Sequence, residues 1–392
     1  MESPFGTAVR GFRESGPRIV RLDPLLLVAT VALLFCSIYT LYTATGDDVE
    51  GSPLFYVIRQ SIYAVVGIGL MLAIARFDYS RLRELKLGIY GVMIATIFLV
   101  FVVGAAARGS QRWIELPFFR FQPSELGKLL LIVALSAFLI DRLRRGSERE
   151  TTSRIMLLAI VPAMLVVVQP DLGSAMVYLV IAVTILFMAG TRWTHFAALG
   201  GIAVLAMSLV LVAAPAAGVE LLKPYQVDRL TAFLDRTDNP REQGYQLNQS
   251  ITAIGSGEKT GRGPEAASQT KLDFLPEHHT DFVFSVVGEQ FGFAGAAFVL
   301  SLFALLIWRG LRIMTMSKNL YGTLIAAGIT AMLMFQVFIN VGMTIGIMPI
   351  TGIPLPLMSY GGSSVIVTLL GIGLLQSIHV HARELAAAKT AL

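Results

Sequence analysis

Long apolar runs separated by short polar segments dominate the chain. About 20 apolar residues cross a bilayer as a helix, so this pattern predicts about ten transmembrane helices. The expected spans are 25–44, 56–75, 86–106, 125–141, 155–169, 172–190, 195–214, 282–308, 321–347 and 363–380. The polar stretch 215–281 is too long for a simple connection. The pattern therefore predicts an all-α polytopic membrane protein with one large extracytoplasmic loop between the seventh and eighth spans.

These boundaries divide the chain into five parts. They are an N-terminal tail over 1–24, seven spans over 25–214, the large loop over 215–281, three spans over 282–380 and a C-terminal tail over 381–392. The chain is 55% apolar and 15% charged, and its mean hydropathy is +0.69. These values exclude an ordinary soluble domain. The one cysteine, Cys36, supports neither a disulfide nor a cysteine metal cluster.

The distribution of basic residues predicts the orientation of the chain. A pI near 9.3 is compatible with nucleic-acid binding, but the Lys and Arg residues lie between apolar runs, where they orient spans. With both termini in the cytoplasm, 19 of the 31 basic residues lie inside and 12 outside, and 7 of those 12 fall in the long loop, which the positive-inside rule exempts. We therefore expect a multi-pass membrane protein with both termini in the cytoplasm, and with membrane lipid but no nucleic acid as a partner.

The remaining basic residues lie at the outer ends of spans, against the orientation rule. They are Arg59, Arg108, Arg112, Arg120 and Lys128. Such residues indicate a local anion, and the alternative is that they extend to lipid headgroups. We favour the anion site.

The segment 107–128 mixes aromatic and charged residues, which favours an interfacial or re-entrant segment. Glu125 and Lys128 are three residues apart and share a helix face. They form either a local salt bridge beside a helix capped by Ser124 or a functional pair in a water-filled cavity. We prefer the functional interpretation.

Three turn-rich segments have open roles. Asp171, in Gln169–Gly173, is placed to cap the following helix, and direct chemistry is an alternative. The glycines of 255–263 flank Lys259 and Arg262, so this stretch could bind phosphate through its backbone, although it lacks Walker spacing, and a mobile lid is an equal alternative. The Pro- and Gly-rich segment 348–364 is expected to line a cavity.

The densest charged cluster lies in 269–289, where the large loop meets an apolar span. Glu277, His279 and Asp281 are crowded at this edge of the membrane, which requires local solvation or a function. We interpret Asp281 as a catalytic base, and the alternative is a helix cap.

Histidines give a weaker signal. His278 and His279, beside those two carboxylates, are the better metal candidate but fall short of a defined site. We therefore assign no metal ligands and no certain cofactor, and a divalent cation stays open. His379 and His381 are expected to be solvated.

Four motifs carry a resemblance that covers nearly the whole chain. They are FQPSELGK at 121–128, QPDLG at 169–173, FLPEHHTDFVFSVVGEQFG at 274–292 and GIPLPLMSYGGSS at 352–364. Together they resemble the SEDS family, the shape, elongation, division and sporulation proteins. The runs 233–246 and 340–362 are more similar to its rod-shape-determining members than to its division members.

The resemblance implies a ten-span peptidoglycan glycosyltransferase that polymerises lipid II and works with a class B penicillin-binding protein, a transpeptidase. It also implies that the acid of the HTD motif, Asp281, is essential. Gln290 departs from the family, because many members have a second acidic residue there. Our substrate-binding candidates are Arg59, Arg112, Glu125, Lys128, Asp171, Gln269, Glu277, His279 and Ser363.

The mechanism expected for this chemistry has two requirements. A sugar hydroxyl must lose its proton as it attacks the anomeric carbon, which calls for one positioned carboxylate. The leaving lipid diphosphate needs positive charge, for which Arg59, Arg112 and Lys128 are candidates. The competing hypotheses are a flippase for the lipid-linked precursor and a non-catalytic scaffold for a partner synthase.

Overall fold

A computed structural model describes residues 22–46, 48–49, 51–107, 110–116, 119–143, 147–209, 242–271, 274–275 and 277–390. The tail before Leu22, Arg108 and residues 210–241 lie outside the described residues, so the expectations made for them are not addressed below.

Every expected span coincides with a helix. The helices are α1 (Pro24–Ala44), α2 (Phe55–Arg76), α3 (Lys86–Val103), α4 (Pro123–Leu143), α5 (Glu148–Val168), α6 (Leu172–Met188), α7 (Trp193–Ser208), α12 (Val283–Met316), α13 (Leu320–Thr344) and α14 (Gly362–Thr390). Among the described residues, seven helices are long and apolar enough to cross a membrane, and α6 and α7 are shorter apolar helices. The remaining helix, α4, carries charged residues near both ends, which lowers its hydropathy.

Polar residues define where several helices begin. The side chains of Asp23, Asp171, Ser147 and Asn319 each accept a hydrogen bond from a backbone N–H in the first turn of α1, α6, α5 and α13. Each therefore satisfies a backbone donor that has no partner within the helix. The expectation that Asp171 caps the sixth span is confirmed.

A small sheet replaces the interfacial or re-entrant segment expected at 107–128. The strands β1 (Ala105–Ala107), β2 (Ser110–Leu116) and β3 (Phe119–Phe121) form an antiparallel sheet in the order β1-β2-β3. The fold is thus mostly helical rather than strictly all-α. Strand pairing satisfies the backbone of a segment that is too polar to cross the bilayer.

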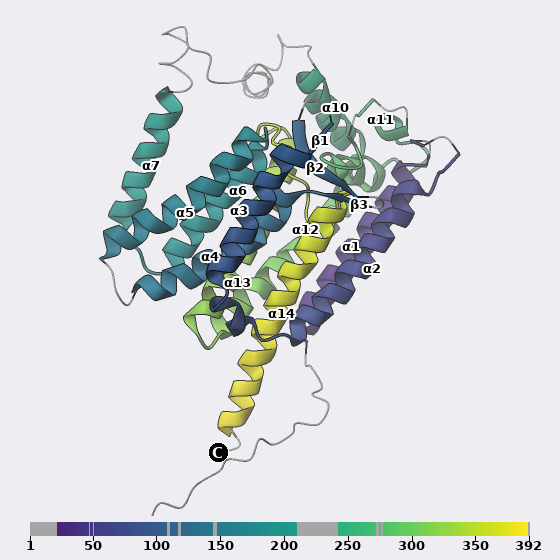
Figure 1. The fold of residues 1–392 in the computed structure, drawn as a ribbon. Coiled ribbons are helices and arrows are strands. Elements are labelled where there is room, and N and C mark those ends of the chain that lie inside the picture. The colour runs from purple at the N-terminus through teal and green to yellow at the C-terminus, as the bar shows by residue number, and fades with distance from the viewer. Residues whose placement is uncertain are drawn as a thin grey trace, which may run out of the picture.

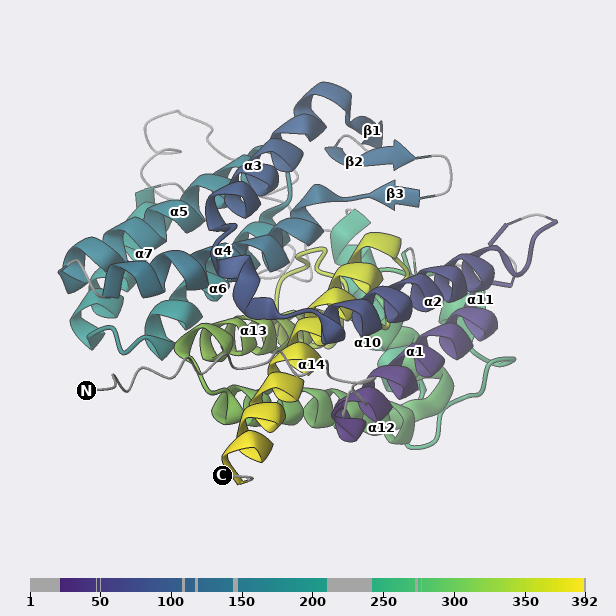
Figure 2. The same ribbon diagram turned by 60° about the horizontal axis from the view of Figure 1, so that its bottom comes forward.

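The central helices are α13 and α14. In the apolar 18-residue stretch of each helix, 72% of the residues are buried in α13 and 83% in α14, against 17% in α3. In Figures 1 and 2, α14 lies along α2 while α3, α5 and α7 are peripheral. The peripheral helices expose apolar side chains. In a bilayer these side chains contact lipid acyl chains, so they need not be buried inside the protein.

The bundle has two distinct ends, which Figure 1 shows at the top and bottom. The sheet gathers at the top with α10 (Glu242–Ser256) and α11 (Ser268–Lys271), which belong to the large loop. We call this the loop end. The opposite end holds the start of α1, the short 3₁₀ helix η1 (Tyr79–Arg83) and the last turns of α14, and we call it the terminal end.

A buried ion pair at the terminal end corrects one expectation. Asp23 accepts hydrogen bonds from Arg309 Nε at 3.1 Å, and its backbone N–H donates to Gln376 Oε1 at 2.7 Å. The His379 Nδ1 atom lies 3.7 Å from Asp23 Oδ2, and the side chain of His379 is 1% exposed. The expectation that His379 is solvated is therefore wrong, because this part of α14 packs against the buried Asp23 at the start of α1. His381 is partly exposed.

Candidate active site

The HTD segment forms a tight turn at the loop end, just before α12. The turn begins at Glu277, whose φ of 56° is in the left-handed region. Its carbonyl accepts hydrogen bonds from the N–H groups of Thr280 and Phe282, and its carboxylate accepts one from the Thr280 hydroxyl at 2.9 Å. The N-cap of α12 is Phe282, without a side-chain cap bond. Asp281 therefore lies in the turn and is not the N-cap residue of this helix.

Two backbone contacts fix this turn on the segment between α13 and α14. The buried amide of Asn340 donates to the carbonyl of Asp281 at 3.0 Å and to that of Ile353 at 2.9 Å. The N–H of Tyr360 donates to the carbonyl of His279 at 2.9 Å. These bonds use the main chain of the turn, so they position Asp281 without engaging its carboxylate, and Asp281 is half-buried.

Arg59 reaches the same neighbourhood from the first turns of α2. Its guanidinium lies over the ring of Phe55, 4.1 Å from the centroid, and it hydrogen-bonds Tyr360. The ring of Tyr56 lies 4.5 Å from that of His279 and 4.9 Å from that of Tyr360. Arg59 is thus the sequence-predicted cation that the structure brings to the turn containing Asp281.

Tyr360 is a neutral hydrogen-bonding group in this cluster. Burial and the neighbouring Tyr63 raise the pKa of Tyr360 to about 12, although Arg59 acts in the opposite direction. The phenol therefore keeps its proton at neutral pH and can both donate and accept.

Gln60 and Ser37 hold the irregular segment that carries Tyr360. Gln60 Nε2 donates to the Ser359 carbonyl at 3.2 Å and to Ser37 Oγ at 3.1 Å, and the Ser37 hydroxyl donates to the Met358 carbonyl at 2.7 Å. Both side chains are fully buried. They satisfy backbone carbonyls that have no helical partner, as non-helical backbone at membrane depth requires.

A second polar cluster surrounds Asp171. Its Oδ2 atom accepts from the Ser124 hydroxyl at 2.9 Å and from Gln122 Nε2 at 3.1 Å, and its Oδ1 atom caps α6 through the N–H of Ser174. The Ser363 hydroxyl lies close by, accepting from the N–H of Gln122 at 2.9 Å. Ser124 therefore binds Asp171 and does not act as the helix cap that the sequence suggested. This cluster joins the starts of α4, α6 and α14.

Glu125 and Lys128 form a salt bridge one helical turn deeper. Lys128 Nζ lies 2.6 Å from Glu125 Oε1, and the two side chains are 1% and 5% exposed. The local salt bridge considered for this pair is present. Its near-complete burial distinguishes it from a surface pair, because two charges lose their hydration at this depth.

Arg112 holds the turn before α6. Its Nε atom donates to the Gln169 carbonyl at 3.2 Å, and its guanidinium also donates to the carbonyl of Pro170. Arg120 differs, because its exposed side chain pairs with the exposed Glu115 at 3.5 Å. The basic residues that violate the orientation rule therefore have different surroundings, and only part of the set lies near Asp281.

The large loop is anchored on α12 through the buried carboxylate of Glu289. It accepts bonds from the N–H groups of Gln269 and Thr270 and from the Thr270 hydroxyl at 2.7 Å. Gln269 thus contributes its backbone N–H to the anchoring of the loop on Glu289. Gln290, at the position of the family departure, accepts a bond from the Thr43 hydroxyl at 2.6 Å.

The Gly-rich stretch is packed on the same helix. The N–H groups of Gly261, Arg262 and Gly263 donate to the carbonyls of Gly257, Glu289 and Gln290. These donors are already occupied, which argues against the phosphate-cradle interpretation. A long mobile lid is equally disfavoured for this stretch.

The segment before α14 links the two polar clusters. It binds the HTD turn through Asn340, as above. It also packs on the first turn of α6, where a Cβ added to Gly173 would lie 2.6 Å from Ile353 and 2.8 Å from the carbonyl of Thr351. Only a glycine allows this approach.

Several residues of this site were not assigned a role from the sequence. Tyr360 and Asn340 lie inside motifs that the resemblance quotes, so closer attention to those motifs could have found them. Asp48 lies between α1 and α2, within 4 Å of both His278 and His279. No sequence signal connects residues about 230 positions apart, and the carboxylates expected beside these histidines were others.

Two cavities of the described residues lie away from the HTD turn. One of about 600 Å³ opens at the terminal end and is lined by Arg83, Lys86, Asp141 and Asn319 among others. Arg83 and Lys86 both bind Asp141 there. Its position far from the HTD turn separates it from the candidate site.

The fold and this site define a class of protein. The chain is a polytopic membrane protein with clusters of buried and half-buried polar residues at the end of the bundle that carries its large loop. The family model FTSW_RODA_SPOVE, described as a cell cycle protein, matches residues 21–384. The chain belongs to this family, which is the SEDS family that its motifs resemble.

Individual relatives agree with this assignment. The peptidoglycan glycosyltransferase MrdB of Escherichia coli (strain K12) is 36% identical over 368 residues, which cover 93% of this chain and 95% of MrdB. A solved chain titled for the coordination of polymerization and crosslinking by a peptidoglycan synthase complex has a TM-score of 0.78, is 32% identical and covers 93% of this chain and 99% of its own. The Thermus thermophilus rod shape determining protein RodA has a TM-score of 0.68, is 30% identical and covers 93% of this chain and 98% of its own.

Proposed function

We propose that this chain is a peptidoglycan glycosyltransferase that polymerises lipid II into β-1,4-linked glycan strands on the outer face of the cytoplasmic membrane during cell elongation. The names of its relatives and its family membership support the activity. The observation that carries the mechanism is the HTD turn: its backbone is fixed by Asn340 and Tyr360, Asp281 is half-buried within it, and Arg59 hydrogen-bonds Tyr360.

Asp281 acts as the general base. The acceptor hydroxyl oxygen attacks the anomeric carbon of the donor, its proton passes to the Asp281 carboxylate, and the bond from that carbon to the lipid diphosphate breaks with inversion. A free sugar hydroxyl is too weakly acidic to ionise beforehand, so the base must be positioned where the bond forms. The main-chain bonds to the HTD turn supply that positioning.

Arg59 stabilises the leaving diphosphate. Its guanidinium can bind two phosphate oxygens at once, and it approaches the HTD turn through Tyr360. Arg112 and Lys128 are further candidates, through the donors that remain after their bonds to carbonyls and to Glu125. His279 and Glu277 shape the turn, and Ser363 and Asp171 hold the adjoining cluster.

A class B penicillin-binding protein is the proposed partner. The solved relative with the TM-score of 0.78 comes from a complex that couples polymerisation and crosslinking, as its title states. Crosslinking is a separate transpeptidase reaction, for which this chain offers no assigned residues. A partner with transpeptidase activity would crosslink the glycan strand while this chain polymerises it.

The decisive experiment compares purified wild type with Asp281→Asn in polymerisation of lipid II. We expect the substitution to lower the rate by about 10²–10⁴-fold, because the amide cannot accept the proton. Thermal unfolding in detergent should be unchanged, since Asn340 binds the backbone of this residue. Glu258→Gln, at an exposed acid of the same loop, is the matched control and should retain full activity.

Three results would overturn the proposal. Full polymerisation by Asp281→Asn would exclude the base. Movement of labelled lipid II across vesicles without any glycan product would identify a flippase, and activity of the complex with Asp281→Ala would indicate a scaffold.

A further inference from the structure

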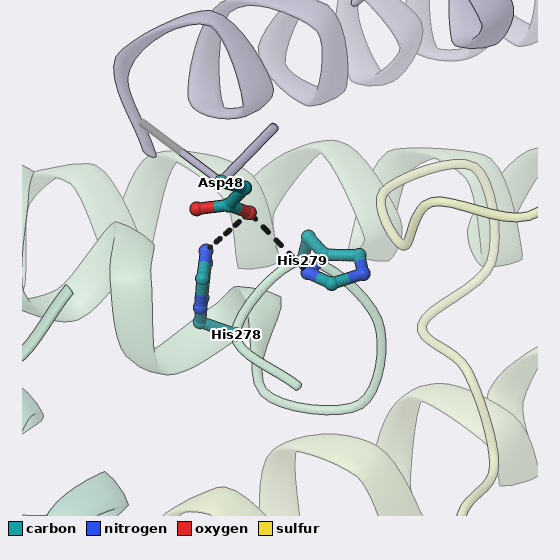
Figure 3. Close-up of side chains that lie close together, drawn as sticks. All are labelled: Asp48, His278 and His279. Carbon is teal, nitrogen blue, oxygen red and sulfur yellow. Dashed lines mark ion pairs between the residues drawn. The ribbon is translucent and has the colours of Figure 1, made fainter. Parts of the chain in front are cut away.

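Three side chains from two distant segments converge at the loop end (Figure 3). Asp48, between α1 and α2, points its Oδ2 atom toward His278 Nε2 at 3.2 Å and toward His279 Nδ1 at 3.8 Å. One ligand atom from each residue lies within 4.8 Å of the other two. The Asp48, His278 and His279 side chains are 19%, 3% and 18% exposed, so the two imidazoles are largely sheltered from water, while Asp48 as a whole residue is exposed.

These separations are close to those of a metal site. Imidazole nitrogen and carboxylate oxygen bind Zn²⁺ at about 2.0–2.2 Å, so two ligands of a tetrahedral ion lie about 3.4 Å apart. The observed separations of 3.2 and 3.8 Å bracket this value. The two imidazole nitrogens lie within 4.8 Å of each other, so side-chain rotations that bring them closer would place all three atoms on one ion.

The orientation of His278 adds an independent argument. Its Nδ1 atom lies 3.2 Å from the carbonyl of Leu275, which can only accept a hydrogen bond, so Nδ1 carries the proton. In the neutral ring, Nε2 then presents a lone pair to the carboxylate oxygen of Asp48. Two lone pairs at 3.2 Å repel, so this geometry requires a positive charge between them, supplied either by a metal ion or by a second proton on the imidazole. A backbone carbonyl that binds the second ring nitrogen is the usual outer contact of a metal-bound histidine.

We propose that Asp48, His278 and His279 bind one divalent transition-metal ion, of the Zn²⁺ or Mn²⁺ type, that fastens the α1–α2 segment to the HTD turn. Two imidazoles favour such ions over Mg²⁺ and Ca²⁺, which prefer oxygen ligands. Three protein ligands also leave a coordination position for water or a phosphate oxygen. The proposal stands on this geometry alone and does not require Asp281 to be the base.

The consequence for the site is positional. His279 is two residues before Asp281, and its carbonyl already binds the N–H of Tyr360. A bound ion would hold the opposite side of the same turn to the first membrane helices. The turn would then be fixed on two sides rather than one.

Binding is tested with Co²⁺ as a spectroscopic probe. The full chain, purified in detergent and treated with a chelator, is titrated with Co²⁺ while its visible absorption is recorded. We expect one equivalent to bind with the spectrum of a four- or five-coordinate ion, and Zn²⁺ but not Mg²⁺ to displace it. Asp48→Asn and His278→Ala should each weaken binding by more than the about 10–100-fold that is typical of losing an outer-sphere partner.

His195→Ala is the matched control. His195 Nδ1 lies 3.4 Å from Glu148, so this pair also joins an imidazole to a carboxylate but has no third ligand among the described residues. It should leave Co²⁺ binding unchanged. Asp281→Asn should also keep binding, which separates this proposal from that for catalysis.

Either of two results would overturn the metal site. The wild type could bind no stoichiometric Co²⁺, or Asp48→Asn could bind as tightly as the wild type. His278 would then be an imidazolium that pairs with Asp48. Because Asp48 lies in a connecting segment and not in a helix, Asp48→Asn should fold normally, and unfolding of the metal-free variant checks this.

Discussion

Several buried polar side chains at the loop end hold the backbone of turns and helix starts, and the Glu125–Lys128 pair differs from them. Asn340, Gln60 and Asp171 each bind main-chain groups of turns at the loop end. Lys128 instead binds a carboxylate in its own helix, with almost no exposure. Because a helix does not need such a pair to form, its burial requires another reason, such as holding charge for a ligand.

Single and paired substitutions separate a structural role of this pair from a functional one. Lys128→Met should lower the free energy of unfolding by about 3–5 kcal/mol, because Glu125 is left buried and unpaired. The double variant Glu125→Gln/Lys128→Met should regain most of that stability. If the pair serves the substrate, the double variant will be stable in thermal unfolding but inactive on lipid II. Wild-type activity in the double variant would show a purely structural pair.

The sequence predicts single residues well where one role follows from position along the chain. Asp171 at a helix start was predicted as a cap and is one. Prediction from the sequence fails where the neighbour that determines the role is distant along the chain. Nothing in the sequence around Asp48 indicates His278, and nothing around His379 indicates Asp23. Ser124 shows the same limit, because a serine before a helix is a cap candidate until a buried carboxylate from another helix takes its hydroxyl.

At the scale of elements, spans were predictable and the connections between them were not. Bilayer thickness sets a minimum helix length, so hydropathy locates every span, although α5 begins 7 residues before its expected start and α12 and α14 end 8 and 10 residues after their expected ends. The segments 105–121 and 255–263 follow no such rule, and the first forms a sheet while the second packs on α12. Their structure depends on tertiary contacts that the local sequence does not encode.

Packing of the Gly-rich stretch on α12 depends on Gly292, where that helix is kinked. Gly292 has φ 63° and ψ −159°, a region open essentially to glycine. A Cβ there would lie 2.3 Å from the N atom of Gly261. Gly292→Ala should therefore cost more than the about 1–3 kcal/mol of backbone strain, measured by thermal unfolding, and should speed amide exchange at 257–263.

Gly255→Ala is the control for this prediction. Its Cβ would meet no atom within 4 Å, and alanine favours the helix by up to about 1 kcal/mol. Equal stabilities of the two variants would contradict the role given to Gly292.

At the scale of the whole molecule, the burial of the helices and the distribution of charge both agree with insertion in a bilayer. Among the seven long apolar helices, the least buried, α3, is at the periphery, and the most buried, α14, is central. The terminal end gathers Arg83, Lys86, Arg309 and their acidic partners. The positive-inside rule predicts that this end faces the cytoplasm, and the HTD turn would then lie on the outer side, as the proposed function requires.

Cysteine labelling tests this orientation. Cys36 is the one cysteine, so Cys36→Ser gives a background without thiols. Lys259→Cys is at the exposed loop end, and Lys318→Cys is at the exposed turn between α12 and α13 at the terminal end. A membrane-impermeant maleimide should label the first in intact spheroplasts and the second only after permeabilisation. The reverse pattern would put Asp281 on the cytoplasmic side, where a base for building the external strand has no substrate, and the proposed function would fail with it.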